Sequence, residues 1–120
     1  MKLIKFTVMG LEKYFNFSDR SSRQEFWWYS LGIATLYIPV MILGWLVSGE
    51  TFDEFESNFI TIIFDIFIII PGISIMVRRL HDVNRSGWWQ FIPLTIIGII
   101  PLVYWLTKRS DDGKNKYGFL

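Results

Sequence analysis

The chain has 120 residues, of which 52% are hydrophobic and 18% aromatic, and its formal net charge at pH 7 is +1. A chain of this length normally forms one domain, and a near-neutral charge lacks the electrostatic footprint of a nucleic-acid-binding protein. The absence of cysteine excludes disulfides and thiolate metal sites, and a single histidine argues against a zinc site made of protein side chains. We therefore expect no metal, no cofactor and no nucleic-acid partner.

The first fifteen residues have the pattern of an amphipathic helix. Ile4, Val8, Leu11 and Phe15 fall on one helical face, and charged residues occupy the other. This pattern predicts an interfacial helix over about residues 2–15, lying on a membrane surface. A soluble amphipathic helix packed on a partner protein is the alternative.

Long apolar blocks follow, and they predict an all-α integral membrane protein with three transmembrane helices after the interfacial one. Residues 26–47 carry no charge over 22 positions, which is about 33 Å of helix and enough to cross the hydrocarbon core. The second predicted span covers residues 59–77. Pro71 and Gly72 predict a kink or a break within it.

The third predicted span covers residues 88–106 and is interrupted by Pro93, Gly98 and Pro101. It could be a full span or a re-entrant hairpin that returns to its starting side, which is tolerated where protein buries the backbone. We favour the full span. The remaining tail, residues 107–120, is polar, and we expect it to be mobile except near its end.

Basic residues predict the orientation, because lysine and arginine are retained on the cytoplasmic side. They occur before the first span and between the second and third, whereas the linker over residues 48–58 has none. We therefore predict a cytoplasmic N-terminus and an external linker. Its acidic residues are Glu50, Asp53, Glu54 and Glu56. Three spans would leave four basic tail residues outside, against the rule: Lys108, Arg109, Lys114 and Lys116.

Tandem tryptophans occur twice, each pair between a basic and an apolar segment. Such positions are typical of residues that anchor a helix at the membrane interface. The predicted anchors are Trp27, Trp28, Trp88 and Trp89.

A cluster of arginines is expected at the same cytoplasmic level. Guanidinium groups pair bidentately with phosphate, so the cluster could hold an anionic lipid headgroup or a phosphorylated ligand. The alternative is topological retention, together with pairing to Asp82 that joins helix ends. The candidate phosphate-binding residues are Arg20, Arg23, Arg78, Arg79, His81, Asp82 and Arg85.

Asp65 is the ionisable residue within the predicted spans, where a carboxylate is costly and is kept mainly when it is paired or functional. From the helical rise, Tyr37 and Tyr104 could lie at a similar depth and donate a hydrogen bond to it. Asp65 could handle a proton or an ion, or it could only stabilise helix packing.

His81 next to Asp82 suggests a base and its orienting carboxylate. Adjacent residues seldom point at each other, however, and no cysteine or second histidine completes a nucleophile or metal set. We therefore predict no catalytic residue and no enzyme activity.

Three segments together resemble a known family. FSDRSSRQEFWW, RRLHDVNRSGWW and DGKNKYG look like the bacterial inner-membrane proteins grouped as domain of unknown function 805, from about Phe17 onward. Family members typically read Gly-Arg where this chain has Asp19-Arg20. The resemblance implies a multi-pass protein of the bacterial inner membrane and supplies no reaction.

The sequence thus favours a structural or regulatory membrane protein that binds anionic lipid or a partner protein through a cytoplasmic belt of arginine and tryptophan. The first alternative is a small transporter or channel that uses Asp65, which would have to form an oligomer to enclose a pathway. The second alternative is a membrane enzyme acting on a lipid.

Overall fold

A computed structural model describes residues 1–48 and 59–120, and the regular elements of these residues are helices. They contain no β-strand beyond an isolated bridge between Asn115 and Gly118. The acidic linker residues Glu50, Asp53, Glu54 and Glu56 lie outside the described residues. In chain order the elements are α1 (Lys2–Glu12), α2 (Arg23–Ser48), α3 (Phe59–Asp82), the 3₁₀ helices η2 (Gly87–Leu94) and η3 (Ile96–Gly98), and α4 (Ile99–Thr107).

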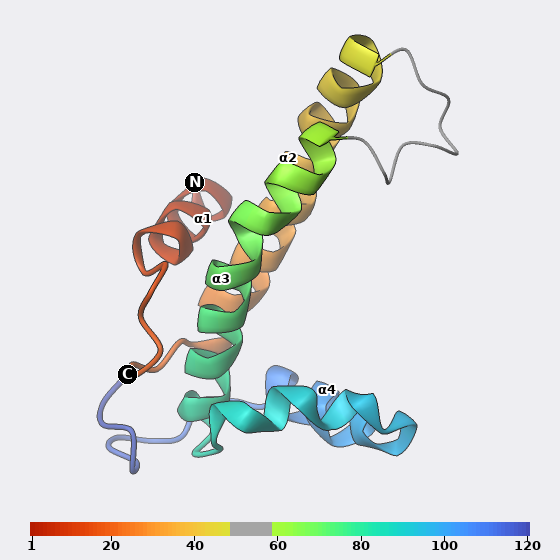
Figure 1. Cartoon of the computed structure of the whole chain (residues 1–120). Helices are drawn as coiled ribbons and strands as arrows, with labels where there is room; N and C mark the ends of the chain where they lie inside the picture. Colours follow the sequence, from red (N-terminus) through yellow and green to blue (C-terminus); the bar gives the residue numbers. More distant parts are fainter. Residues whose placement is uncertain (49–58) are drawn as a thin grey trace.

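Helices α2 and α3 lie side by side as two long rods (Figure 1). In the described part of the chain, these are the two helices long and apolar enough to cross a membrane. Only 11% and 22% of their apolar windows are buried. A helix that is apolar all round must be covered by protein or by lipid. Because protein leaves most of these side chains exposed, lipid is the solvent that fits them.

Helix α3 runs through Pro71 without a break, where the sequence predicted a kink or a break. Proline has no N–H, so the carbonyl of Phe67, four residues earlier, has no partner within the helix. The hydroxyl of Tyr14 donates a hydrogen bond to this oxygen at 2.6 Å. The segment after α1 therefore compensates for the missing bond in α3.

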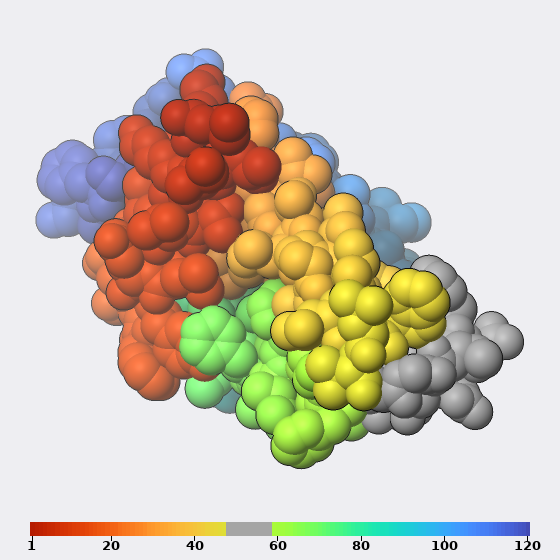
Figure 2. Space-filling view, turned by 90° about the horizontal axis from the view of Figure 1, so that it is seen from above, coloured from red at the N-terminus to blue at the C-terminus, as the bar shows by residue number. Residues whose placement is uncertain are grey.

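Helix α1 ends at Glu12, three residues before the predicted end, and packs closely on α2. Figure 2 shows α1 (red) lying along the outside of α2 (orange to yellow). A Cβ added to Gly32 would lie 1.7 Å from the Oγ1 of Thr7, and one added to Gly10 would lie 2.2 Å from the Tyr29 ring. Two glycines thus allow the backbones to approach.

The third predicted span, residues 88–106, is not a single helix, and its shape is that of the hairpin given as the alternative. The chain forms η2, turns through η3 and returns as α4, so that residues 87–107 make a hairpin at one end of α2 and α3 (Figure 1). The rings of Trp89 and Trp105, near its two ends, lie 5.5 Å apart. The turn needs glycine, because a Cβ on Gly98 would lie 2.1 Å from the carbonyl oxygen of Ile92. We call residues 87–107 the C-terminal hairpin.

The polar tail after the C-terminal hairpin folds back onto the end of α3. Its backbone N–H at Asp111 donates to the carbonyl of Asp82 at 3.1 Å, and the Asn115 side chain donates to the carbonyl of His81 at 2.9 Å. The predicted mobile tail is therefore a packed segment with defined partners.

Candidate functional site

The site begins where α3 ends. Asn84 has φ 61°, the left-handed conformation that asparagine tolerates better than most residues. The backbone N–H of Asn84 donates to the backbone carbonyl of His81 at 3.0 Å, and that of Arg85 donates to the carbonyl of Leu80 at 2.8 Å. This is the Schellman pattern that closes a helix. It turns the chain sharply and leaves the last polar side chains of α3 facing the tail.

Asp82 is fully buried and joins three separate parts of the chain. Its Oδ1 accepts from Nε of Arg20 at 3.1 Å, and its Oδ2 accepts from Nη1 of Arg79 at 3.0 Å. Ser110 of the tail also donates to Oδ2. One carboxylate therefore connects the segment before α2, the end of α3 and the tail.

The remaining donors of Arg20 and Arg79 hold backbone carbonyls. Arg20 donates to the carbonyls of Asp111, Gly113 and Gly118 at 2.9, 2.7 and 2.8 Å. Arg79 donates to the carbonyl of Leu106 at 3.2 Å and to that of Lys108. These two guanidinium groups thereby fix the tail and the end of α4.

Arg78 fixes the segment that follows α1. It donates to the hydroxyls of Ser21 and Ser74 at 2.9 and 3.1 Å, and to the carbonyls of Lys13 and Asn16 at 3.0 and 2.9 Å. Its Nη2 lies 3.9 Å from Oε1 of Glu25. The four buried residues at the centre of this network form what we call the base cluster: Arg20, Arg78, Arg79 and Asp82.

The structure divides the seven predicted phosphate-binding residues into five that are buried, the base cluster and His81, and two that are exposed. The arginines of the base cluster donate to protein acceptors, except at Nη2 of Arg78, which has no hydrogen-bond partner. This arrangement matches the predicted alternative, in which the arginines pair with Asp82. Arg23 and Arg85 are exposed, and Arg85 lies 5.0 Å from the centre of the Trp105 ring. These two arginines remain accessible to a phosphate group.

His81 and Asp82 do not face each other. Nδ1 of His81 lies 3.2 Å from the carbonyl oxygen of Asp19, and its ring stacks on Tyr117 at 3.8 Å and 6°. Asp82 faces the arginines instead. Among the described residues, no group of three or more His, Cys, Asp or Glu side chains could hold a metal ion.

A groove lies beside the start of α2, with a volume of about 570 Å³. It combines one exposed cation with two of the predicted tryptophan anchors. The indole N–H of Trp27 donates to the carbonyl of Leu106 at 3.1 Å, and Arg23 donates to that of Thr107 at 3.2 Å, so the end of α4 borders it. The residues lining this basic groove are Arg23, Gln24, Trp27, Trp28 and Leu31.

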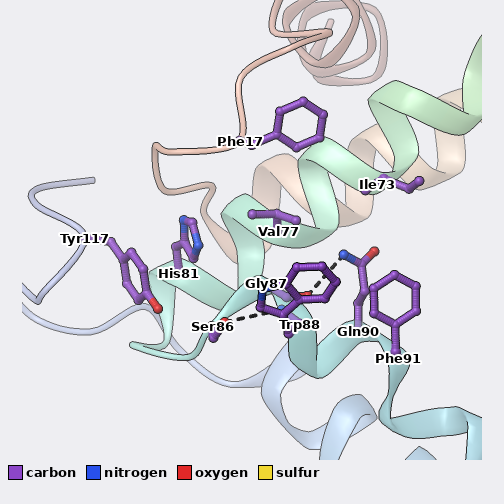
Figure 3. Close-up of a pocket in the computed structure, with 10 residues that line it drawn as sticks. All are labelled: Phe17, Ile73, Val77, His81, Ser86, Gly87, Trp88, Gln90, Phe91 and Tyr117. Atoms are coloured by element: carbon purple, nitrogen blue, oxygen red, sulfur yellow. Dashed lines mark hydrogen bonds between the residues drawn. The ribbon is translucent and has the colours of Figure 1, made fainter.

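A second cavity of about 390 Å³ lies between α3, η2 and the tail (Figure 3). In this view the Trp88 and Phe91 rings stand on the η2 side and the His81–Tyr117 stack closes the tail side. We call it the aromatic pocket. It is lined by Phe17, Ile73, Val77, His81, Ser86, Gly87, Trp88, Gln90, Phe91 and Tyr117.

Asp65 lies on an exposed face of α3 and accepts a hydrogen bond from the hydroxyl of Tyr37 in α2. The other predicted partner, Tyr104, is in α4, beside the end of α3 that carries Asp82, far along the helix from Asp65 (Figure 1). The structure therefore brings together one of the two predicted pairs.

Sequence reasoning missed the partners that complete the base cluster. The hydroxyl of Ser21 accepts a hydrogen bond from Arg78, and that of Ser110 donates one to Asp82. The Asn115 side chain donates to the carbonyl of His81 at the end of α3. The available signal was the DGKNKYG segment. Its two glycines adopt positive φ, 62° at Gly113 and 94° at Gly118, and both carbonyls accept from Arg20.

Comparisons with known proteins find relatives that are named as inner membrane proteins. The Escherichia coli (strain K12) inner membrane protein YhaH is 29% identical over 113 residues, covering 90% of this chain and 88% of the relative. Inner membrane protein YhaI of the same strain is 29% identical over 111 residues, covering 90% and 87%. No solved structure gives a significant match. The family described as "Protein of unknown function (DUF805)" matches residues 14–119, and the chain belongs to that family.

Proposed function

We propose that the chain is a two-span protein of the bacterial inner membrane with both termini in the cytoplasm, and that it binds anionic phospholipid without catalysing a reaction. The observation that carries the proposal is the distribution of charge. All twelve lysines and arginines lie within residues 2–23 and 78–116, and none lies between them. Residues 1–25 and 78–120 also contain six acidic side chains, so these two regions have a net charge of +6.

With three spans the basic residues of the tail would lie outside the cell, against the positive-inside rule, and the two-span topology removes this conflict. The tail is tied through Ser110 and Asp111 to Asp82, so its basic residues stay on the same side as the RRLHD segment. All twelve basic residues are then cytoplasmic, in agreement with the positive-inside rule.

The C-terminal hairpin fits a membrane-embedded position on that side. Its turn exposes large apolar side chains, and such an exposed patch needs a lipid or protein cover. Leu94 and Ile96 are each 87% exposed and Ile97 is 81% exposed. We propose that this turn inserts among the lipids from the cytoplasmic face without crossing.

The basic groove is the proposed lipid site. Arg23 supplies a forked cation for a phosphate, and its contact with Thr107 uses only one of its donors. Trp27, Trp28 and Leu31 supply an apolar surface for the adjoining acyl chain, at the level where tryptophan prefers the membrane interface.

Cysteine labelling tests the topology, and the chain contains no cysteine of its own. The side chain of Asp112 is 96% exposed, so Asp112→Cys leaves the base cluster intact. We expect Asp112→Cys to be protected from an impermeant thiol reagent in intact cells, whereas Ser57→Cys in the acidic linker should react. Labelling of Asp112→Cys without permeabilisation would refute the two-span topology.

Native mass spectrometry tests the lipid site. Arg23→Gln should reduce retained phosphatidylglycerol, because it removes the phosphate-binding cation. Arg109→Gln is the matched control: it removes the same charge from a side chain that is 84% exposed and outside the groove. An equal loss of lipid in both variants would indicate diffuse attraction by net charge and would contradict a site at Arg23.

A second candidate function rests on the exposed Asp65–Tyr37 pair, which fits a proton or cation site in an oligomeric transporter. Asp65→Asn keeps the size and hydrogen-bonding capacity of the side chain but cannot titrate. If Asp65→Asn has the thermal stability of the wild type but has lost proton or cation flux in liposomes, transport is supported. Absence of flux in the wild type, under pH and sodium gradients, would assign Asp65 to helix packing.

A further inference from the structure

The aromatic pocket extends along the axis of α3. Ile73, Val77 and His81 are four residues apart, so they line the same face of the helix over about 12 Å. Ile73 is deeper in the apolar part of α3, and His81 is one residue from its end. If α3 crosses the bilayer, in either direction, the pocket runs from the hydrocarbon region to the polar interface.

The polarity of the lining follows the same direction. Phe17, Phe91 and Ile73 surround the apolar end, where the Gln90 amide is the one polar side chain of the lining, whereas His81 and Ser86 are at the polar end (Figure 3). No Lys, Arg, Asp or Glu lines the pocket. A ligand that fits this lining is therefore uncharged and amphipathic, with its apolar part directed into the membrane.

The pocket offers a donor at its polar end, in Ser86, and an acceptor between Ile73 and Phe91, in Gln90 (Figure 3). The Ser86 hydroxyl accepts from the backbone N–H of Trp88 at 3.4 Å and keeps its own hydrogen for donation. The Gln90 side chain donates to the carbonyl of Gly87 at 3.1 Å, which leaves its carbonyl oxygen free to accept. These groups suit a ligand that carries ring carbonyls when oxidised and hydroxyls when reduced.

The shape of the pocket favours a flat ring. The His81 and Tyr117 rings stack almost parallel, at 6°, and both line the pocket together with Trp88. Planar π-systems pack well in offset contact with such surfaces. The cavity of about 390 Å³ is at the small end of ligand sites, which suits one ring whose chain continues outside it.

We propose that the aromatic pocket binds the ring of a membrane-soluble quinone, with the isoprenoid tail leaving past Ile73 into the bilayer. This site is separate from the basic groove, and its occupancy does not depend on Arg23. The proposal concerns binding and does not invoke electron transfer by the protein.

The test uses the full chain in lipid nanodiscs and a benzoquinone that bears one isoprenoid unit as the probe. Equilibrium dialysis against empty nanodiscs separates specific uptake from partition into lipid. We expect saturable binding of one quinone per chain. Ile73→Trp fills the apolar end of the pocket and should weaken binding by about tenfold or more.

Ile62→Trp is the matched control, because Ile62 is on the same helix, is 42% exposed against 37% for Ile73, and does not line the pocket. It should bind quinone as the wild type does. If Ile73→Trp proves unstable, Gln90→Leu removes the acceptor without adding bulk to α3 and should weaken binding of the reduced quinone. Quinone uptake no greater than that of empty nanodiscs would overturn the proposal, and so would equal weakening of quinone binding by Ile62→Trp. A phospholipid that displaces the quinone, and that is lost from Ile73→Trp but retained by Ile62→Trp, would also overturn it.

Discussion

Replacing Asp82 with asparagine tests whether the base cluster stabilises the whole end of the protein. The substitution preserves the shape of the side chain but removes the charge that pairs with the buried Arg20 and Arg79. It also points an amide donor at groups that are themselves donors, including Ser110. Removing one partner of a buried ion pair costs about 3–5 kcal/mol. Since a domain of ordinary stability has only about 5–15 kcal/mol in total, Asp82→Asn should strongly destabilise the fold.

Limited trypsin digestion in mild detergent, combined with thermal unfolding, measures this effect. Arg78 and Arg79 are fully buried, so trypsin should not cut the folded wild type there, whereas Asp82→Asn should be cleaved at both positions. Asp112→Asn makes the same chemical change on a side chain that is 96% exposed. If the free energy of unfolding of Asp82→Asn is within about 0.5 kcal/mol of that of this control, and the variant resists cleavage, our account of the base cluster is wrong.

Two further changes test the packing around α1, each read out by thermal unfolding in detergent. Gly32→Ala should destabilise the fold by about 1–3 kcal/mol, because its Cβ would overlap Thr7. Gly72→Ala is the control: its Cβ meets no atom within 4 Å, so it should stabilise the fold slightly. If Gly72→Ala were the less stable of the two variants, the packing of α1 on α2 would be contradicted. Tyr14→Phe should cost about 1 kcal/mol by leaving a helix carbonyl unpaired. Tyr14→Phe should have little effect in a Pro71→Ala background, because the N–H of residue 71 then bonds to the Phe67 carbonyl within the helix. An equal loss of stability in both backgrounds would show that the Tyr14 hydrogen bond does not compensate for the proline.

The two long helices were predictable because apolar length alone identifies a span. The first agrees closely, residues 26–47 against Arg23–Ser48. The second was predicted to end at residue 77, where the arginines begin, but α3 continues to Asp82. A charged residue normally ends a predicted span. Here the helix continues because Arg78 and Arg79 find acceptors elsewhere in the fold.

For the third apolar segment a full span was favoured over the hairpin, because its length was given more weight than its breaks. Pro93 and Gly98 were visible, and both are common within transmembrane helices. What decides for a hairpin is the close approach of Gly98 to Ile92, together with the bond from Trp27 to Leu106. Neither contact has a local signature in the sequence.

The candidate site was only half predictable for a related reason. The arginines and Asp82 stood out by their density in two short segments, and the structure brings them together. Their partners in the tail, Ser110 and Asn115, are ordinary polar residues about thirty positions further along the chain. A single sequence does not say which distant backbone carbonyls a guanidinium group will reach, so internal pairing and phosphate binding could not be separated.

The base cluster also sets an order on biogenesis. Arg20 is made early and inserted near the membrane surface, but three of its acceptors are carbonyls within residues 111–118. During translation both long helices can enter the bilayer while Arg20 and Arg79 still lack acceptors from the tail. A nascent chain that stops just after α4 would be inserted and yet incomplete, with exposed arginines that quality-control proteases could reach. The base cluster therefore gains its full set of acceptors only when residues 111–118 have been made and have folded back.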